Sequence, residues 1–248
     1  MTSQSQKLDR NEYEERPQSV SSNEPDLERL RTKGGHIDNR DQPSLPVIHR
    51  SFANPAPLGL LSFGTGVFLL SLLGVHARGI VEKNILVGVF VFFGGICQFI
   101  SGIMEFVAGN TFGATVFPSY AALSLSFAMI FIPGTGIIDA YSDAQGHITP
   151  EFNQALAMYL FSWLILNAIF TVASLRSSWT LFAAFLLFNV ELILLATGYM
   201  VNNAGLLTAG NSVGFLVSFC AYWSGCAGLW SGGITPFTLP AFPMYKYV

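Results

Sequence analysis

Six long apolar segments, nearly free of charge, constrain this chain more than any other feature. A helix that crosses about 30 Å of hydrocarbon needs about 20 mainly apolar residues. The segments that meet this need are Leu58–Val75, Ile85–Met104, Val116–Ile138, Ala155–Leu175, Trp179–Val201 and Ala209–Trp230. Because backbone amides in lipid must bond internally, we expect each segment to be a transmembrane α-helix. The sequence lacks the short alternating segments that a transmembrane β-barrel requires.

The distribution of charge supports the same conclusion. Charged residues make up 11% of the chain, against about 25% in an ordinary soluble domain. The ten charged residues after position 50 are Arg78, Glu82, Lys83, Glu105, Asp139, Asp143, Glu151, Arg176, Glu191 and Lys246. A soluble globule of that size could not cover its surface with so few charges. The net charge of −3 gives no reason to expect nucleic acid as a partner.

The chain divides by composition into three parts. Residues 1–51 are polar and cannot bury enough apolar surface to offset their ordering entropy, so we expect a disordered tail. Residues 52–233 form the expected transmembrane domain, and residues 234–248 a short C-terminal tail. Met1 is followed by polar residues, so no signal peptide is expected. Basic residues near the span ends place both termini in the cytoplasm: the inner ones are Arg40, Arg50, Arg176 and Lys246, the outer ones Arg78 and Lys83.

Motifs typical of enzymes are missing from the sequence. There is no Ser-His-Asp set, no HExxH and no Gly-rich phosphate loop. The cysteines, Cys97, Cys220 and Cys226, lie in apolar stretches without metal-ligand spacing. We therefore expect neither catalysis nor a metal or other cofactor.

The first span opens with Asn54-Pro55-Ala56-Pro57-Leu58-Gly59-Leu60. Asn54 suits the N-cap of a helix, and Pro55 suits the first helical position, where a missing N–H costs nothing. Free N–H groups and the helix dipole make such a helix start a natural anion site. A plain helix cap is the alternative interpretation of the same residues.

Polar residues within the spans are candidates for a transport path. Glu191 lies mid-span, where a carboxylate costs about 2.5–3.5 kcal/mol on insertion scales. It must face protein or water, and it is a candidate proton-linked group; a hydrogen bond between helices is the alternative. Gln98 and Glu105 are seven apart and share one helix face. Glu105 is either proton-linked or a structural partner of the turn at Asn110.

A second polar pair lies in the fourth span. Asn167 and Thr171 are four residues apart and therefore share one face of the helix. Contact with a neighbouring helix is the expected use of this pair.

The chain resembles the acetate uptake transporter family, the succinate–acetate permeases of bacteria, archaea and fungi. Residues 54–60 read NPAPLGL, the signature of that family. The family's order and spacing continue in Gly94-Gly95, Gln98, Gly102, Glu105, Gly109-Asn110-Thr111-Phe112-Gly113 and Ser119-Tyr120. The resemblance covers roughly residues 52–233. The long polar tail resembles that of fungal members.

This resemblance implies a six-helix protomer, assembled as a homohexamer in the plasma membrane, with a substrate path through each protomer. Family members move acetate and similar short monocarboxylates, commonly in symport with protons. A Phe, a Tyr and a Leu line the narrowest part of the path. By motif spacing these positions fall on Phe63, Tyr120 and Phe188, with Leu187 as the alternative for the third. A bulky Phe188 would favour small substrates over succinate.

The expected mechanism draws the anion to the helix start at Asn54 and through the constriction. The candidate polar or proton-linked residues along this path are Gln98, Glu105, Asn110, Thr111 and Glu191. Two alternatives remain for the function. One is a passive acetate channel, and the other is a non-transporting sensor or a protein related to ammonium export.

Overall fold

The computed structural model describes residues 53–231 and 235–244, and within them it confirms the predicted all-α membrane fold. Six helices are long and apolar enough to cross a membrane. Their bounds are α1 Ala56–Gly74, Ile85–Ala108, α4 Thr111–Phe131, Pro150–Arg176, α7 Trp179–Met200 and α8 Ala204–Leu229. The predictions for residues 1–51 and for Lys246 lie outside the described residues.

Two of these spans are composite. The second runs through α2 (Ile85–Gly88), the π-helix η2 (Val89–Cys97) and α3 (Gln98–Ala108). The fourth joins α6 (Pro150–Ala173) to the 3₁₀ turn η3 (Ser174–Arg176). The loops carry the short helices η1 (Ala77–Gly79) and α5 (Ile137–Ala140). π-Helical turns are rare and often accompany functional sites, and η2 ends at Cys97, directly before Gln98.

Three predicted helix starts were wrong by several residues, and polar caps explain two of them. The third span begins at Thr111 because the Asn110 side chain accepts a hydrogen bond from Gly113 N at 3.3 Å. It ends at Phe131 because Ile132 is extended before Pro133. The sixth span begins at Ala204 because Asn203 accepts from Gly205 N at 2.9 Å. The fourth begins at Pro150 rather than Ala155.

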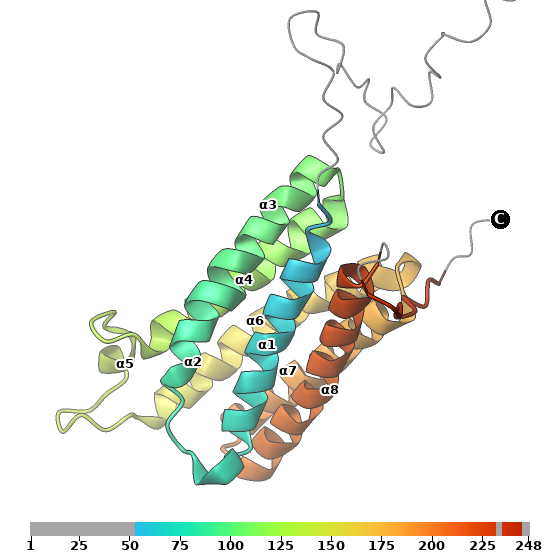
Figure 1. Cartoon of the computed structure of the whole chain (residues 1–248). Helices are drawn as coiled ribbons and strands as arrows, with labels where there is room; N and C mark the ends of the chain where they lie inside the picture. The colour runs from blue at the N-terminus through green and yellow to red at the C-terminus, as the bar shows by residue number, and fades with distance from the viewer. Residues whose placement is uncertain (1–52, 232–234, 245–248) are drawn as a thin grey trace, which may run out of the picture. The chain divides into compact units, whose positions relative to one another are not determined.

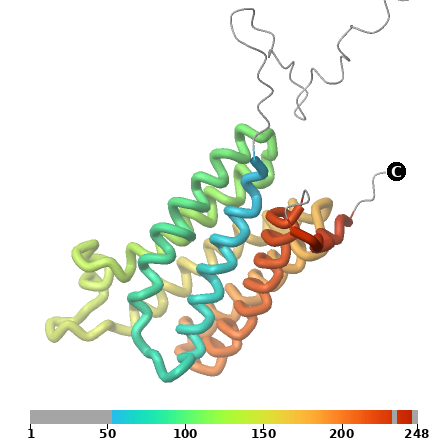
Figure 2. The backbone as a smooth tube through the Cα atoms, viewed as in Figure 1, coloured from blue at the N-terminus to red at the C-terminus, as the bar shows by residue number. Residues whose placement is uncertain are grey.

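Helix α1 lies between two groups of helices. On one side it packs against η2 and α3, which in turn pack against α4. On its other side it packs against α8, followed by α7 and α6 (Figure 1). The same order is visible along the backbone tube in Figure 2. Residues of α1 are therefore placed to contact both halves of the bundle.

The outward-facing side chains are large and apolar, as expected for helices solvated by lipid. Ile85, Phe92 and Ile165 each expose about two thirds of their surface, at 70%, 67% and 67%. The buried side includes polar groups that are almost wholly enclosed, among them Ser71, Gln98, Asn167 and Glu191. The bundle thus presents apolar side chains to the surroundings and encloses a few polar groups in an otherwise apolar interior.

Helices α3 and α4 approach closely at a proline. Pro118 lies inside α4, and a Cβ on Gly102 of α3 would sit 2.3 Å from the Pro118 ring. Only glycine fits at position 102 without a shift of one helix. This contact fixes Gln98, one turn earlier on α3, beside α4.

Candidate functional site

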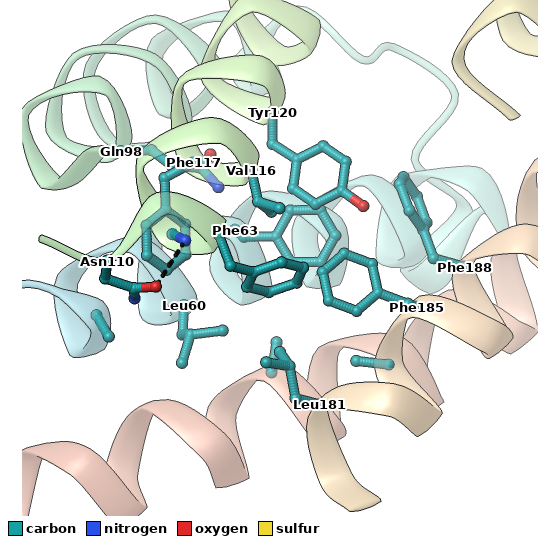
Figure 3. Close-up of a pocket in the computed structure, with 15 residues that line it drawn as sticks. Leu60, Phe63, Gln98, Asn110, Val116, Phe117, Tyr120, Leu181, Phe185 and Phe188 are labelled. Carbon is teal, nitrogen blue, oxygen red and sulfur yellow. Dashed lines mark hydrogen bonds between the residues drawn. The ribbon is translucent and has the colours of Figure 1, made fainter. Parts of the chain in front are cut away.

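A cavity of about 90 Å³ lies between α1, α3, α4, α7 and α8. On the same measure one water needs about 10–15 Å³, so a ligand of a few non-hydrogen atoms fits. We call it the proximal cavity; Figure 3 shows its lining, which includes Leu60, Phe63, Gln98, Asn110, Phe117, Tyr120, Leu181, Phe185 and Phe188. Side chains from the starts of α1, α4 and α7 surround it. Its walls are mainly apolar, with few polar groups, as in many small-molecule sites.

Gln98 is the buried polar group of the proximal cavity. Its side chain is fully buried, and neither Nε2 nor Oε1 has a hydrogen-bond partner among the residues that the structure describes. A primary amide offers two N–H donors and one carbonyl acceptor. An enclosed amide without partners is costly unless a bound molecule satisfies it. Gln98 is therefore suited to donate hydrogen bonds to a small anion such as a carboxylate.

Three aromatic rings meet at one end of the proximal cavity. Phe63 stacks on Tyr120 with ring centroids 4.9 Å apart. Phe188 meets both rings edge-on, and its centroid lies 5.3 Å from that of Phe63 and 5.7 Å from that of Tyr120. Figure 3 shows these rings side by side, with Phe185 next to them. The structure thus brings the three predicted constriction residues together. Leu187 packs against the apolar core and does not line the proximal cavity.

A polar network holds Tyr120 in place. The Tyr120 hydroxyl donates to Asn167 Oδ1 on α6. Asn167 Nδ2 donates to Phe185 O at 3.0 Å and to Asn189 Oδ1 at 2.8 Å. Asn189 Nδ2 in turn donates to Thr171 Oγ1 at 2.7 Å. The polar pair predicted on the fourth span therefore contacts α7, as expected, and it also orients a ring of the constriction.

The signature Asn54–Leu60 joins α1 to its neighbours. The first helix begins at Ala56, one residue later than predicted, and Asn54 Oδ1 accepts from Ala56 N at 3.1 Å. Ser101 Oγ on α3 donates to Pro55 O at 2.7 Å. A Cβ on Gly59 would lie 2.6 Å from the Phe117 ring of α4. The signature is therefore used for close helix contacts.

The remaining signature residues have separate surroundings. Ala56 and Leu60 line the proximal cavity, whereas Leu58 is 39% exposed. Pro57 is buried, and a Cβ on Gly228 of α8 would lie 3.0 Å from it. Only two side chains of the seven thus reach the cavity.

Glu105 does not line the proximal cavity and supports the Asn110 turn. Asn110 Nδ2 donates to Glu105 Oε2 at 2.7 Å, while the other carboxyl oxygen is buried with no partner in the described part of the chain. The turn itself uses Gly109 at a positive φ of 75°. Asn110 lines the proximal cavity. Thr111 is exposed and does not line the cavity.

A second cavity, which we call the distal cavity, lies beyond the rings. Phe63 and Phe188 line both cavities, so the constriction separates them. The polar residues of the distal cavity are Lys83, Ser124, Glu191, Tyr199 and Asn211. Sequence reasoning singled out Glu191 but gave Lys83 no place on the path. In the sequence, Lys83 is a basic residue two positions before the second predicted span, and nothing else points to a place for it in a cavity.

Glu191 is fully buried in the distal cavity wall. Neither carboxyl oxygen has a hydrogen-bond partner. The predicted alternative of a hydrogen bond between helices is therefore wrong for the described residues. Glu191 instead lies against the backbone of α8, where a Cβ on Gly214 would sit 2.7 Å from Glu191 Oε1.

Comparison of the sequence with known protein families identifies one match. Residues 38–246 match the model of the GPR1/FUN34/yaaH family. The chain belongs to the GPR1/FUN34/yaaH family. Its match covers all six helices, including every residue of the proximal cavity and the distal cavity.

Relatives within the GPR1/FUN34/yaaH family include fungal proteins. The chain is 40% identical over 184 residues to accumulation of dyads protein 2 of Saccharomyces cerevisiae, and the match covers 74% of this chain and 64% of that protein. It is 33% identical over 207 residues to acetate permease A of Emericella nidulans, covering 80% of this chain and 70% of that one. This kinship confirms the resemblance to acetate transporters.

A solved structure of the family has the same fold. The structure of the bacterial acetate channel SatP superposes with a TM-score of 0.64 at 28% sequence identity. The superposition covers 75% of this chain and 99% of that one. The present chain is therefore a multi-pass membrane protein of a family that includes an acetate permease and an acetate channel.

Proposed function

We propose that this protein carries acetate and similar short monocarboxylates across a membrane in symport with protons. The observation that carries the proposal is that the aromatic constriction lies between the proximal cavity and the distal cavity, with Phe63 and Phe188 lining both. An apolar constriction suits a methyl group, and the free amide of Gln98 suits a carboxylate. The acetate permease and acetate channel among its relatives support the same substrate.

Four steps make up the proposed mechanism. The anion enters the proximal cavity near the helix starts at Asn54 and Asn110, where the helix dipole is favourable. Gln98 then donates hydrogen bonds to the carboxylate. The constriction of Phe63, Tyr120 and Phe188 admits the small apolar end. A proton travels on Glu191, which lies beyond the rings. Glu105, hydrogen-bonded to Asn110, has a supporting role.

A passive channel is the second candidate, favoured by the name of the related bacterial structure. The test is labelled-acetate flux with purified protein in liposomes. Symport predicts uptake against an acetate gradient when only a proton gradient is imposed. A channel predicts flux down the acetate gradient alone. Flux equal to that of protein-free vesicles would exclude both and favour a sensor or an ammonium-related role.

We also propose a homohexamer in the plasma membrane with both termini in the cytoplasm. The support for orientation is the basic residue count at the span ends, which places the turn at Arg176 inside and Lys83 outside. The mass of the detergent-purified particle tests the assembly. Accessibility of a reporter in the loop at residues 141–149 tests the orientation, since that loop should face outside.

A further inference from the structure

Lys83 is an unpaired cation at the distal cavity. It lies in the loop between α1 and α2, is half-buried and lines the cavity wall. Among the residues that the structure describes, its ammonium makes no hydrogen bond and no ion pair. Burial lowers the pKa of Lys83 below its ordinary value of 10.5. A lysine ammonium is a compact point charge on a flexible stem, well suited to meet a carboxylate.

Glu191 lines the same cavity and also lacks partners. Its exposed fraction is zero, and both oxygens are unpaired within residues 53–231 and 235–244. Ser71 Oγ on α1 is likewise buried without a partner, and it shares with Glu191 the contact with Gly214. The cavity therefore holds a carboxyl and an ammonium that face a common space without satisfying each other.

In the part of the chain that the structure describes, no charged side chain other than Lys83 and Glu191 lines this cavity. Ser124 of α4 and Asn211 of α8 are uncharged, and the α6 residue in the wall is Leu160. Tyr199, on the same helix as Glu191, is the remaining titratable group in the lining. The charge state of the cavity is thus decided mainly by Lys83 and Glu191.

We infer that Lys83 binds the carboxylate of the substrate in the distal cavity when Glu191 carries a proton, and that an ionised Glu191 competes for the same ammonium. In a weakly polar cavity, opposite charges attract more strongly than in water. With Glu191 ionised, the cavity is already neutral and has no excess charge to attract an anion. With Glu191 protonated, the ammonium is free, and a monocarboxylate restores neutrality. One proton and one anion are then taken up together, which would couple them.

This inference rests on the proposed function and adds Lys83 as the group that links the anion to the proton. The test measures the KM for labelled acetate with the full chain in liposomes, after subtraction of flux in protein-free vesicles, at several values between about pH 5 and pH 8. In the unmodified protein the KM should rise with pH. Glu191→Gln, which mimics the protonated carboxyl, should keep a low KM that no longer changes with pH.

Lys83→Met should raise the KM about tenfold and abolish its pH dependence. The double variant should match Lys83→Met, because Glu191 acts through the ammonium. Arg78→Gln is the matched control, since Arg78 lies in the same loop but is exposed and lines neither cavity described above. An unchanged KM in Lys83→Met, or a lower KM when Glu191→Gln is added to it, would overturn the inference.

A second measurement applies to the unmodified protein and does not need transport. Acetate should slow the acylation of Lys83 by an amine-reactive reagent, measured by mass spectrometry, more strongly at pH 5 than at pH 8. Equal protection at both pH values would contradict the coupling. If the unmodified protein moves no acetate, the proposed function fails; if it does so and the Lys83 variants behave normally, the inference alone fails.

Discussion

The hydroxyl of Tyr120 donates a hydrogen bond to Asn167 Oδ1, and this contact ties the constriction on α4 to a polar network on α6 and α7. Asn167 uses its whole side chain, since Nδ2 donates to both Phe185 O and Asn189 Oδ1. The hydroxyl of Tyr120 is therefore fixed by Asn167 while the face of its ring stacks on Phe63. The position of the constriction depends on polar groups that lie outside the cavities.

Replacing Asn167 with alanine should destabilise the protein and loosen the constriction. The change leaves the Tyr120 hydroxyl without its acceptor and Asn189 Oδ1 without its donor in a buried site, at a cost of about 2–3 kcal/mol. Thermal unfolding of the purified protein in detergent measures the loss. Ser162→Ala is the matched control on α6, because Ser162 is exposed and bonds only to Met158 O. Equal melting temperatures for the two variants would contradict the role of the network.

Phe188→Leu should widen the constriction. The ring of Phe188 is 6% exposed and contacts both Phe63 and Tyr120. The smaller side chain leaves space at the cost of about 1–2 kcal/mol of stability. Uptake of longer monocarboxylates such as butyrate should rise relative to acetate. Phe219→Leu, the same change on an exposed face of α8, should leave the ratio of uptake unaltered.

Gln98→Leu should stabilise the fold and at the same time weaken the binding of acetate. An unpartnered buried amide is unfavourable, so an apolar side chain of similar size should stabilise the fold by about 1 kcal/mol. The same change removes the donor proposed for the carboxylate and should raise the KM for acetate about tenfold. Thermal unfolding and acetate flux together check this opposite pair of effects. A destabilised variant with normal flux would show that Gln98 is a structural residue.

Gly214→Ala should disturb the wall of the distal cavity. A Cβ there would sit 2.1 Å from Ser71 Oγ and 2.7 Å from Glu191 Oε1, so both side chains must move. We expect a loss of about 1–3 kcal/mol in stability from overpacking, together with reduced acetate flux. Gly88→Ala is the control, since a Cβ at Gly88 meets nothing within 4 Å. A neutral Gly214→Ala would place Glu191 in a looser environment than the structure describes.

The acylation of Lys83 should follow its lowered pKa. Burial disfavours the ammonium, so the neutral amine forms at lower pH than in an exposed lysine. The pH at half-maximal labelling should lie below 10.5, whatever the access of the reagent. Attraction of anions by Lys83 is therefore present below this midpoint and is lost as pH rises through it. A midpoint at or above 10.5 would mean that Lys83 is freely solvated.

The helix boundaries show what sequence reasoning could and could not find. The starts of α1 and α7 were predicted within two residues, because Asn54 and Ser178 precede abrupt apolar runs. The start of α4 was missed by five residues, since Thr111–Thr115 is not apolar enough to be counted as part of a span. The cap at Asn110 decides that start, and a hydropathy pattern does not register a cap.

The aromatic constriction was predicted through family resemblance, whereas its support was not. Phe63, Tyr120 and Phe188 occupy three different helices; motif spacing selected the first two and left Leu187 open beside Phe188 for the third. The bond from Tyr120 to Asn167 spans 47 residues, and no local pattern indicates such a pair. The same limit applies to Lys83, which enters the distal cavity only because α1, α2 and α7 pack as they do.

The sequence by itself determined that this chain is a bundle of six membrane helices, because hydrophobic length and the lack of charge leave no other way to satisfy the backbone in lipid. It also determined the family, through residues 54–60 and 109–113. Only the tertiary structure decided that Gln98 and Glu191 lie on opposite sides of the rings, and that Lys83 shares a cavity with Glu191. Those relations depend on the rotation and packing of each helix, which arise from contacts between distant residues.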